Sequence, residues 1–263
     1  MRHHAHKKAI VITSRVHPGE PQASFMLEGI ISAILADTPL ANELRKHFIF
    51  KVVPMLNPDG VIHGNYRCSL LGCDLNRKWQ TPNKFLHPTI FYAKQLIRYN
   101  HWERKVILYC DLHGHSRKQN AFFYGCSYKN YEQEGRIKNA QLRIIPLLCC
   151  HKNPIYSFAG CSFRIEKGKE STGRVVVFRE FNIMNSFTLE CSFHGKVTEG
   201  SIRHLTLEDM SNIGSKLIEV LECYLPREQN MLNRIGSKVL DIFYDEFVKF
   251  VPAYILKREE EKR

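Results

Sequence analysis

Two short segments of the sequence carry side chains that could bind one metal ion. His17 and Glu20 stand three residues apart in the sequence HPGE, whose proline and glycine are typical of a turn. His113 and His115 follow an apolar stretch in the sequence DLHGHS, where the end of a strand would carry them toward a crevice. Two histidines, a glutamate and a water molecule form a known ligand set for catalytic zinc, so either His113 or His115 would serve as the third ligand. A surface turn and a hydrogen-bonded core histidine are the structural alternatives for the two segments.

One carboxylate interrupts an apolar segment further along the chain. Glu190 lies within Phe187–Cys191, which has the composition of a strand. A buried carboxylate is unfavourable unless it is paired or takes part in function. We therefore expect Glu190 to be a functional residue.

The segments that must position these residues alternate between strands and helices. Composition and periodicity predict strands over Ala9–Ser14, Phe48–Leu56, Val106–Leu112, Ala121–Tyr124, Val175–Phe178 and Phe187–Cys191. They predict helices over Ser24–Ala36, Thr89–Tyr99 and Glu132–Cys150. A further helix is expected to begin with a capping box at Thr206 and to end at Pro226. An amphipathic segment follows over about Met231–Phe250. This alternation predicts the α/β class, with a mixed, largely parallel central sheet flanked by helices.

Length and composition are those of a folded, water-soluble protein. The chain has 263 residues, of which 44% are hydrophobic and 24% charged, and it shows no internal repeat or linker. A single domain over residues 1–263 is the simplest organisation. The nine cysteines include no CxxC pair, which favours free thiols in the reducing cytoplasm. No apolar run reaches roughly 18 residues and no signal peptide is recognisable, so we expect neither a membrane span nor secretion.

The net charge of +12 indicates an acidic partner. Nucleic acid, anionic lipid and acidic protein tails would all suit this charge. The sequence contains no helix-turn-helix, zinc-finger or RNP signature, and its aromatic residues do not alternate with basic ones in a recognisable motif. We therefore expect no nucleic-acid partner.

Six segments together resemble the M14 zinc metallocarboxypeptidases, most closely their cytosolic carboxypeptidase branch, which removes glutamates from protein tails. The segments occur in the order of that family, and the matches span roughly residues 9–195. They are RVHPGE (15–20), NPDGVIHGNYRCSL (57–70), DLNRKW (74–79), DLHGHS (111–116), KESTGR (169–174) and SFTLECSF (186–193). The combination is specific, although no single segment is. It implies the α/β/α fold of zinc carboxypeptidases.

Carried over position by position, the resemblance implies that His17, Glu20 and His113 bind one catalytic zinc ion. It makes Glu190 the general base, which takes a proton from the activated water and delivers it to the leaving amine. Asp74 corresponds to a carboxylate that orients the first zinc histidine.

The resemblance also assigns the residues that hold the substrate backbone. Arg67 corresponds to the arginine that helps to stabilise the tetrahedral intermediate. Asn76 and Arg77 correspond to the pair that binds the terminal carboxylate, a task that suits the planar, always-charged guanidinium.

Arg174 and Lys169 are the candidates for specificity. Arg174 lies near the positions that line the pocket for the last side chain in related enzymes, where a cation would select an acidic residue, and Lys169 could assist. A polar solvated loop is the alternative for this segment. With the positive net charge, these residues imply removal of C-terminal glutamates from acidic tails such as those of polyglutamylated tubulin, in the cytoplasm and at microtubules or cilia.

Two features depart from the pattern of the family. Residues 157–189 contain no tyrosine, whereas the digestive members carry one in the loop before the general base. The β-sandwich domain that precedes the catalytic domain in the cytosolic branch is expected to be absent, because the chain begins close to its first predicted strand.

Two other functions are alternatives to the deglutamylating peptidase. A catalytically inactive protein could keep the carboxypeptidase fold and bind acidic tails, and the loss of a ligand or of the base would mark it. All the expected residues are present in the sequence. A zinc amidohydrolase acting on small N-acyl amino acids would share the metal ligands, but the long match from NPDG to NRKW favours a peptidase.

Overall fold

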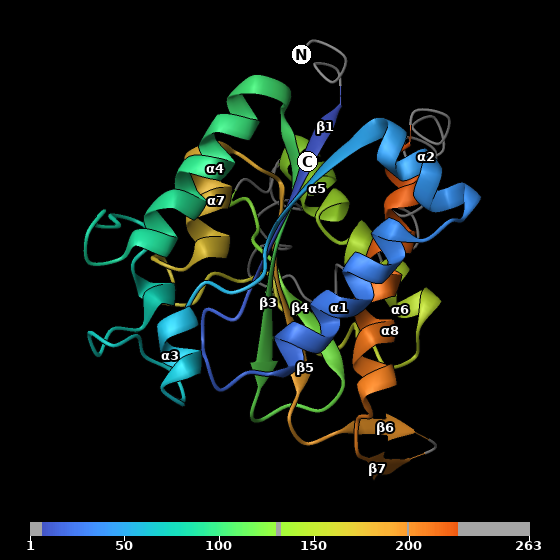
Figure 1. Ribbon diagram of the computed structural model, residues 1–263. Helices are drawn as coiled ribbons and strands as arrows, with labels where there is room; N and C mark the ends of the chain where they lie inside the picture. The colour runs from blue at the N-terminus through green and yellow to red at the C-terminus, as the bar shows by residue number, and fades with distance from the viewer. Residues whose placement is uncertain (1–6, 130–132, 199, 226–263) are drawn as a thin grey trace, which may run out of the picture.

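A five-stranded sheet forms the centre of the molecule (Figure 1). The computed structural model describes residues 7–129, 133–198 and 200–225. The strand order is β2-β1-β3-β5-β4, with the bounds β1 Lys8–Ser14, β2 Phe48–Val53, β3 Val106–His115, β4 Ala121–Tyr124 and β5 Asn185–Ser192. The first four strands in this order run parallel, and β4 pairs antiparallel with β5. The predicted mixed, largely parallel sheet is confirmed.

Helices cover both faces of the sheet. One face carries α1 (Gln22–Leu35), α6 (Ile144–Lys152) and α8 (Leu207–Glu219), and the other carries α4 (Pro88–Arg104) and α7 (Gly173–Phe181). The side chains of strand β1 alternate between the two faces of the sheet, so the strand contributes to the core on both sides. Ile10 and Ile12 join the core under α1 and α8, while Ala9 and Val11 join the core under α4 and α7. The result is the expected three-layer α/β/α arrangement.

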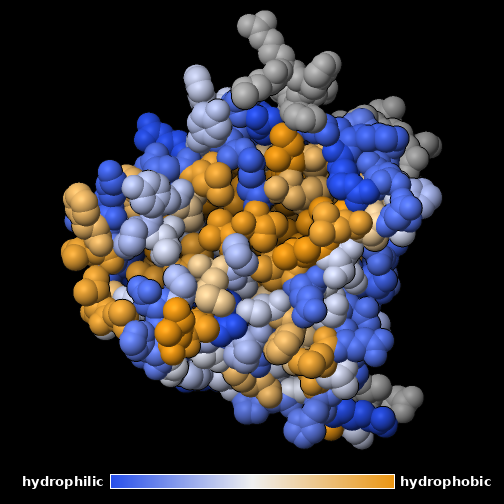
Figure 2. Space-filling model, viewed as in Figure 1, coloured by the Kyte–Doolittle hydropathy of each residue, from blue (hydrophilic) through white to orange (hydrophobic). Residues whose placement is uncertain are grey.

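Shorter elements complete the described part of the chain. They are α2 (Pro39–His47), α3 (Pro58–Ile62), α5 (Gln133–Gln141), the 3-10 helices η1 (Leu75–Arg77) and η2 (Val220–Tyr224), and the hairpin of β6 (Lys196–Thr198) and β7 (Ser201–Arg203). Strand β2 is one edge of the sheet, and Figure 2 shows apolar surface gathered in a hollow on that side. None of the described helices meets the length and hydropathy criteria for a membrane span alone; α1 and α2 meet them only jointly, across a bend of 92°.

The helix predicted to begin at Thr206 is confirmed together with its capping box. The Thr206 hydroxyl accepts a hydrogen bond from the N–H of Asp209 at 3.1 Å, and the Asp209 carboxylate accepts one from the N–H of Thr206 at 2.9 Å. This reciprocal pair satisfies two N–H groups at the start of α8. The predicted end at Pro226 and the segment Met231–Phe250 lie outside the described residues.

One predicted element type and several predicted boundaries are wrong. The segment Val175–Phe178, predicted as a strand, lies inside helix α7, and its three valines are all buried. Burial of an apolar run overrides the weak β-preference of valine. The predicted helix over Glu132–Cys150 is two helices, α5 and α6, and the strand predicted to reach Leu56 ends at Val53. Pro54, which has no N–H to donate, follows that strand.

The connections that follow β1, β3 and β5 meet at one edge of the sheet, the lower edge in Figure 1. This follows from the parallel pairing, which places the carboxyl ends of these strands side by side. The HPGE turn follows β1, DLHGHS ends β3, and Glu190 lies near the end of β5. The segments that were expected to carry chemistry therefore share one edge.

Helices α1 and α8 cross at two glycines, and this close crossing fixes α1, which begins directly after the HPGE turn. A Cβ atom at Gly29 would lie 1.9 Å from the carbonyl oxygen of Ser211, and one at Gly214 would lie 1.8 Å from the carbonyl oxygen of Met26. Real side chains cannot approach backbone atoms so closely. The two helix backbones touch only because both positions lack a side chain.

We predict that Gly29→Ala destabilises the protein by about 2 kcal/mol or more, because the new methyl group must push the helices apart. Helix propensity alone would give a gain of about 1 kcal/mol for the same change. Urea unfolding followed by circular dichroism measures the difference, with Ser32→Ala on the exposed side of α1 as the matched control. Unchanged or increased stability of Gly29→Ala would show that α1 and α8 do not pack as described.

Candidate metal centre and active site

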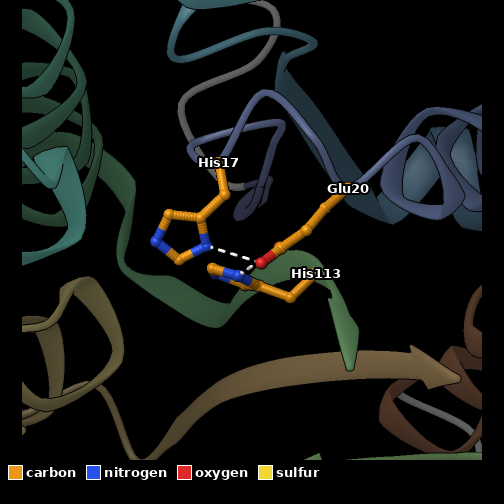
Figure 3. Close-up of side chains that lie close together, drawn as sticks. All are labelled: His17, Glu20 and His113. Carbon is orange, nitrogen blue, oxygen red and sulfur yellow. Dashed lines mark hydrogen bonds and ion pairs between the residues drawn. The ribbon is translucent and has the colours of Figure 1, made fainter. Parts of the chain in front are cut away.

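The structure brings His17, Glu20 and His113 together at the carboxyl edge of the sheet (Figure 3). One ligand atom from each lies within 4.8 Å of the others, and all three residues are buried. The Glu20 carboxylate lies between the imidazoles: Oε1 is 2.8 Å from Nδ1 of His17, and Oε2 is 2.9 Å from Nδ1 of His113. Of the two histidines in DLHGHS, His113 therefore shares this site and His115 does not.

The turn after β1 is shaped by its own side chains and by a neighbouring loop. Arg15 has a positive φ of 55°, which turns the chain sharply, and its guanidinium donates hydrogen bonds to the carbonyl of Pro18 and the hydroxyl of Ser24, both at 2.8 Å. The N–H of Gly19 donates to the carbonyl of Tyr66 at 2.8 Å, and a Cβ at Gly19 would lie 2.7 Å from that oxygen. Only glycine permits this close approach.

A carboxylate holds the other ring nitrogen of each histidine. Nε2 of His17 lies 3.1 Å from Oδ1 of Asp74, and Nε2 of His113 lies 2.7 Å from Oδ2 of Asp111. Thr13 in turn donates to Oδ1 of Asp111 at 2.6 Å. A carboxylate at Nε2 favours the ring proton on that nitrogen and leaves the Nδ1 lone pair directed at the centre of the cluster.

The donor set fits a divalent metal ion. Two Nδ1 atoms and one carboxylate converge on a buried point, and without a cation the Nδ1 lone pairs would face carboxylate oxygens. Zinc prefers nitrogen and oxygen ligands in a tetrahedral arrangement, and in catalytic sites three protein ligands leave a fourth position open. The residues at this point therefore fit the single zinc ion that the sequence predicts.

The pKa values of Glu20 and His113 are both shifted in the direction that favours positive charge on the histidines and negative charge on the carboxylate. Burial alone would raise the pKa of Glu20, but His113 and His17 outweigh burial and hold this pKa well below its usual range. Burial alone would lower the pKa of His113, but Asp111 and Glu20 hold it well above its usual value. Positive charge is thus favoured at the centre of the cluster, as a bound cation would supply it.

Glu190 faces the cluster from the neighbouring strand β5. It is paired in register with His113, so the two side chains leave the same face of the sheet. The side chain is buried, and its Oε2 atom has no hydrogen-bond partner among the described residues. Burial raises the pKa of Glu190 to about 7. A carboxyl group with such a pKa can take up and release a proton near neutral pH, as a general base must.

The predicted substrate residues Arg67, Asn76 and Arg77 lie around Asp74. Arg67 donates two hydrogen bonds to Oδ2 of Asp74, at 3.0 and 2.7 Å, and a guanidinium nitrogen of Arg77 lies 3.7 Å from the same oxygen. The side-chain nitrogen Nδ2 of Asn76 is 3.5 Å from Nε2 of His113. Both guanidinium groups remain partly exposed, so an anionic ligand could reach them beside the metal cluster.

Lys169 adds a third cation to this group. Burial lowers its pKa, and the positive charges of Arg77 and Arg67 lower it further. The structure therefore places the charge of Lys169 close to those of the two arginines. In the segment for which a polar solvated loop is the alternative, Lys167 and Gly168 are exposed and Lys169 is partly buried.

Arg174 lies in the first turn of α7 and is buried, with 6% of its surface exposed. Its guanidinium donates to the carbonyl of Gly125 and lies 3.6 Å from Sγ of Cys126. Within the described residues, no carboxylate forms an ion pair with Arg174. The carboxylates of Glu190 and Glu166 act on the guanidinium without forming an ion pair with it. An anionic group of a ligand in direct contact would offset more of the cost of its burial.

Sequence reasoning does not identify two residues of this site. Asp111 precedes His113 by two positions on β3, a spacing that places both side chains on one face of a strand and could have signalled its role. Tyr124, at the end of β4, approaches the site only because β4 pairs with β5. No local pattern in the sequence indicates that pairing.

Curated relatives share the sequence over nearly the whole chain. Human cytosolic carboxypeptidase 2 is 43% identical over 248 residues, which cover 93% of this chain and 27% of the relative. Human cytosolic carboxypeptidase 1 is 40% identical over an alignment that covers 99% of this chain and 22% of the relative. The chain thus spans about a quarter of the length of these relatives.

Solved structures share the fold. A metallo-carboxypeptidase from Burkholderia cenocepacia superimposes with a TM-score of 0.69 at 23% identity, and one from Pseudomonas aeruginosa with a TM-score of 0.71 at 22% identity. In both cases the likeness covers 84% of this chain and 58% of the other, and at such identities it speaks for the fold alone. Residues 1–210 match the sequence pattern of the zinc carboxypeptidases, peptidase family M14, and over most of its length the chain therefore belongs to that family.

Proposed function

We propose that this chain acts as a zinc-dependent metallocarboxypeptidase that removes glutamates from the C-termini of acidic protein tails, such as those of polyglutamylated tubulin. The observation that carries the proposal is that three features lie on the same face of the sheet. These are a buried metal-ligand cluster, the carboxylate of Glu190, whose Oε2 has no hydrogen-bond partner among the described residues, and the buried cation of Arg174, which forms no ion pair with a described carboxylate.

Glu190 is suited to move the proton of the reaction. His17, Glu20 and His113 would hold the zinc ion, which would supply Lewis-acid polarisation of the scissile carbonyl and a lowered pKa of water. The free Oε2 of Glu190 can accept the proton of the attacking water and return it to the nitrogen of the leaving amino acid, so that one water is consumed and the peptide bond is broken. Asp74 and Asp111 keep the two histidines in one tautomer throughout.

The cations beside the cluster are suited to hold the end of a peptide chain. Asn76 and Arg77 would bind the terminal carboxylate, and Arg67 would stabilise negative charge on the carbonyl oxygen during attack. Asp74 orients Arg67 and lies near Arg77, so the guanidinium groups are positioned before a substrate arrives. Lys169 adds attraction for an anionic ligand at the same place.

Arg174 supports an acidic last residue as the preferred substrate. Its buried charge would gain an ion pair from a glutamate side chain but nothing from an aliphatic one. The net charge of +12 would steer acidic tails toward the protein over longer distances. The relatives are named cytosolic carboxypeptidases, in line with a cytoplasmic place of action, at microtubules or cilia if tubulin is the substrate.

An inactive protein that only binds acidic tails is the other reading of the same fold. No observation favours it over catalysis, because the predicted ligands converge and Glu190 faces them. A protein that only binds tails would have no use for a buried, unpartnered carboxylate at that position, where its burial is costly.

We predict that Glu190→Gln keeps zinc but lowers kcat on a glutamate-ended peptide by a factor of about 10² to 10⁴, because the amide cannot accept the proton. Turnover is measured by release of free glutamate, and bound zinc by elemental analysis. Glu28→Gln, an exposed change on α1, is the matched control and should retain full activity. If Glu190→Gln keeps wild-type turnover, Glu190 is not the base.

We predict that Arg174→Gln lowers kcat/KM for a glutamate-ended peptide about 100-fold more than for a leucine-ended one, because the lost charge matters only to the acidic side chain. Arg174→Lys keeps the charge, so its kcat/KM for the glutamate-ended peptide should lie between that of the unaltered chain and that of Arg174→Gln. Arg179→Ala, exposed on the same helix, serves as the control. Equal losses on both peptides would remove Arg174 from the specificity pocket.

A further inference from the structure

Tyr124 lies on the same face of the central sheet as the proposed catalytic residues. It lies opposite Thr188 of β5, which is in turn opposite Asp111 of β3. Side chains alternate along strands and directly paired residues point to the same side of a sheet. The side chain of Tyr124 therefore points to the same face of the sheet as those of His113 and Glu190. Its partner Thr188 lies two residues before Glu190 on β5.

The hydrogen of the Tyr124 hydroxyl is free to donate. Nδ1 of His115 accepts hydrogen bonds from the N–H groups of Arg117 and Lys118, at 3.2 and 3.0 Å, so the ring proton of His115 must be on Nε2. Nε2 lies 3.4 Å from the Tyr124 hydroxyl oxygen and donates to it in a long hydrogen bond. Among the described residues, the hydroxyl has no other partner, and its own hydrogen is left without an acceptor.

Two cations lie over the ring of Tyr124, and one of them is Arg174, which the proposed substrate would meet. The guanidinium carbon of Arg174 lies 6.0 Å from the centre of the Tyr124 ring, and the ammonium of Lys118 lies 5.2 Å from it on the loop before β4. Burial, and then the carboxylates of Glu190 and Glu166, raise the pKa of Tyr124 to about 12. The phenol therefore keeps its hydrogen at neutral pH while remaining partly exposed.

We infer that the Tyr124 hydroxyl donates a hydrogen bond to the side-chain carboxylate of the last substrate residue, beside Arg174, and so helps to select glutamate. The inference rests on the proposed function. Arg174 would balance the charge of that carboxylate, whereas the phenol would fix its position through one directional hydrogen bond. His115 acts as a positioning residue, because its Nε2–H occupies the lone pair of Tyr124 and turns the hydroxyl hydrogen away from itself.

The test is the variant Tyr124→Phe, which keeps the ring and removes only the hydroxyl. Two peptides that differ only in a terminal glutamate or leucine are compared. We expect KM for the glutamate-ended peptide to rise about 10- to 100-fold, the range for a lost hydrogen bond to a charged group, with kcat changed less than about threefold. KM for the leucine-ended peptide and the zinc content should not change. Tyr99→Phe, exposed on α4, is the control.

A binding measurement without turnover separates this inference from the proposed function. Calorimetry of the glutamate-ended peptide with zinc-loaded Glu190→Gln, with and without Tyr124→Phe, should show the same 10- to 100-fold loss. Unchanged affinity, or equal losses on both peptides, would overturn the role of Tyr124 alone. If the unaltered chain shows no chelator-sensitive cleavage of the glutamate-ended peptide, the proposed function fails and the inference fails with it.

The positioning role of His115 is read from a double-mutant cycle. His115→Gln should raise KM for the glutamate-ended peptide in the unaltered chain but add no further loss in the Tyr124→Phe background, since the hydroxyl that it orients is then missing. Additive losses would mean that His115 acts independently of Tyr124, and would overturn the positioning role.

Discussion

The carboxylate of Glu20 lies between two imidazoles whose other nitrogens are already held by Asp74 and Asp111. This buried arrangement is electrostatically balanced only when positive charge lies at its centre, as a cation bound by Nδ1 of each histidine and by the carboxylate would provide. The parallel sheet makes the arrangement attainable, because it places the ends of β1 and β3 side by side. The parallel pairing of β3 with β5 likewise brings Glu190 into register with His113 of the cluster.

Around this centre, the fold distributes charges in two ways. Glu190 and Arg174 are both buried. Oε2 of Glu190 has no hydrogen-bond partner and Arg174 forms no ion pair among the described residues, so each would gain from a ligand. Arg67 and Arg77 are partly exposed and are oriented by Asp74. A peptide end with a terminal carboxylate and an acidic side chain would meet both kinds of cation, which is why an acidic C-terminal residue is the substrate that we propose.

The sequence was most informative where chemistry and geometry are local. The HPGE turn keeps His17 and Glu20 three residues apart on one short loop, so their convergence could be predicted before any tertiary structure was known. The segment Val175–Phe178 was predicted wrongly because its burial, and not its β-branched composition, determines its conformation in α7. The positions of Asp111 and Tyr124 relative to the site cannot be predicted from local sequence, because they depend on the pairing of β3, β5 and β4 in the folded chain.

The most direct measurement of the central claim is mass spectrometry of a peptide ending in several glutamates after incubation with the zinc-loaded chain. We expect successive loss of single glutamate residues from the C-terminus, abolished by a chelator and restored by added zinc. A folded, zinc-bound protein that leaves the peptide intact would contradict the proposed function.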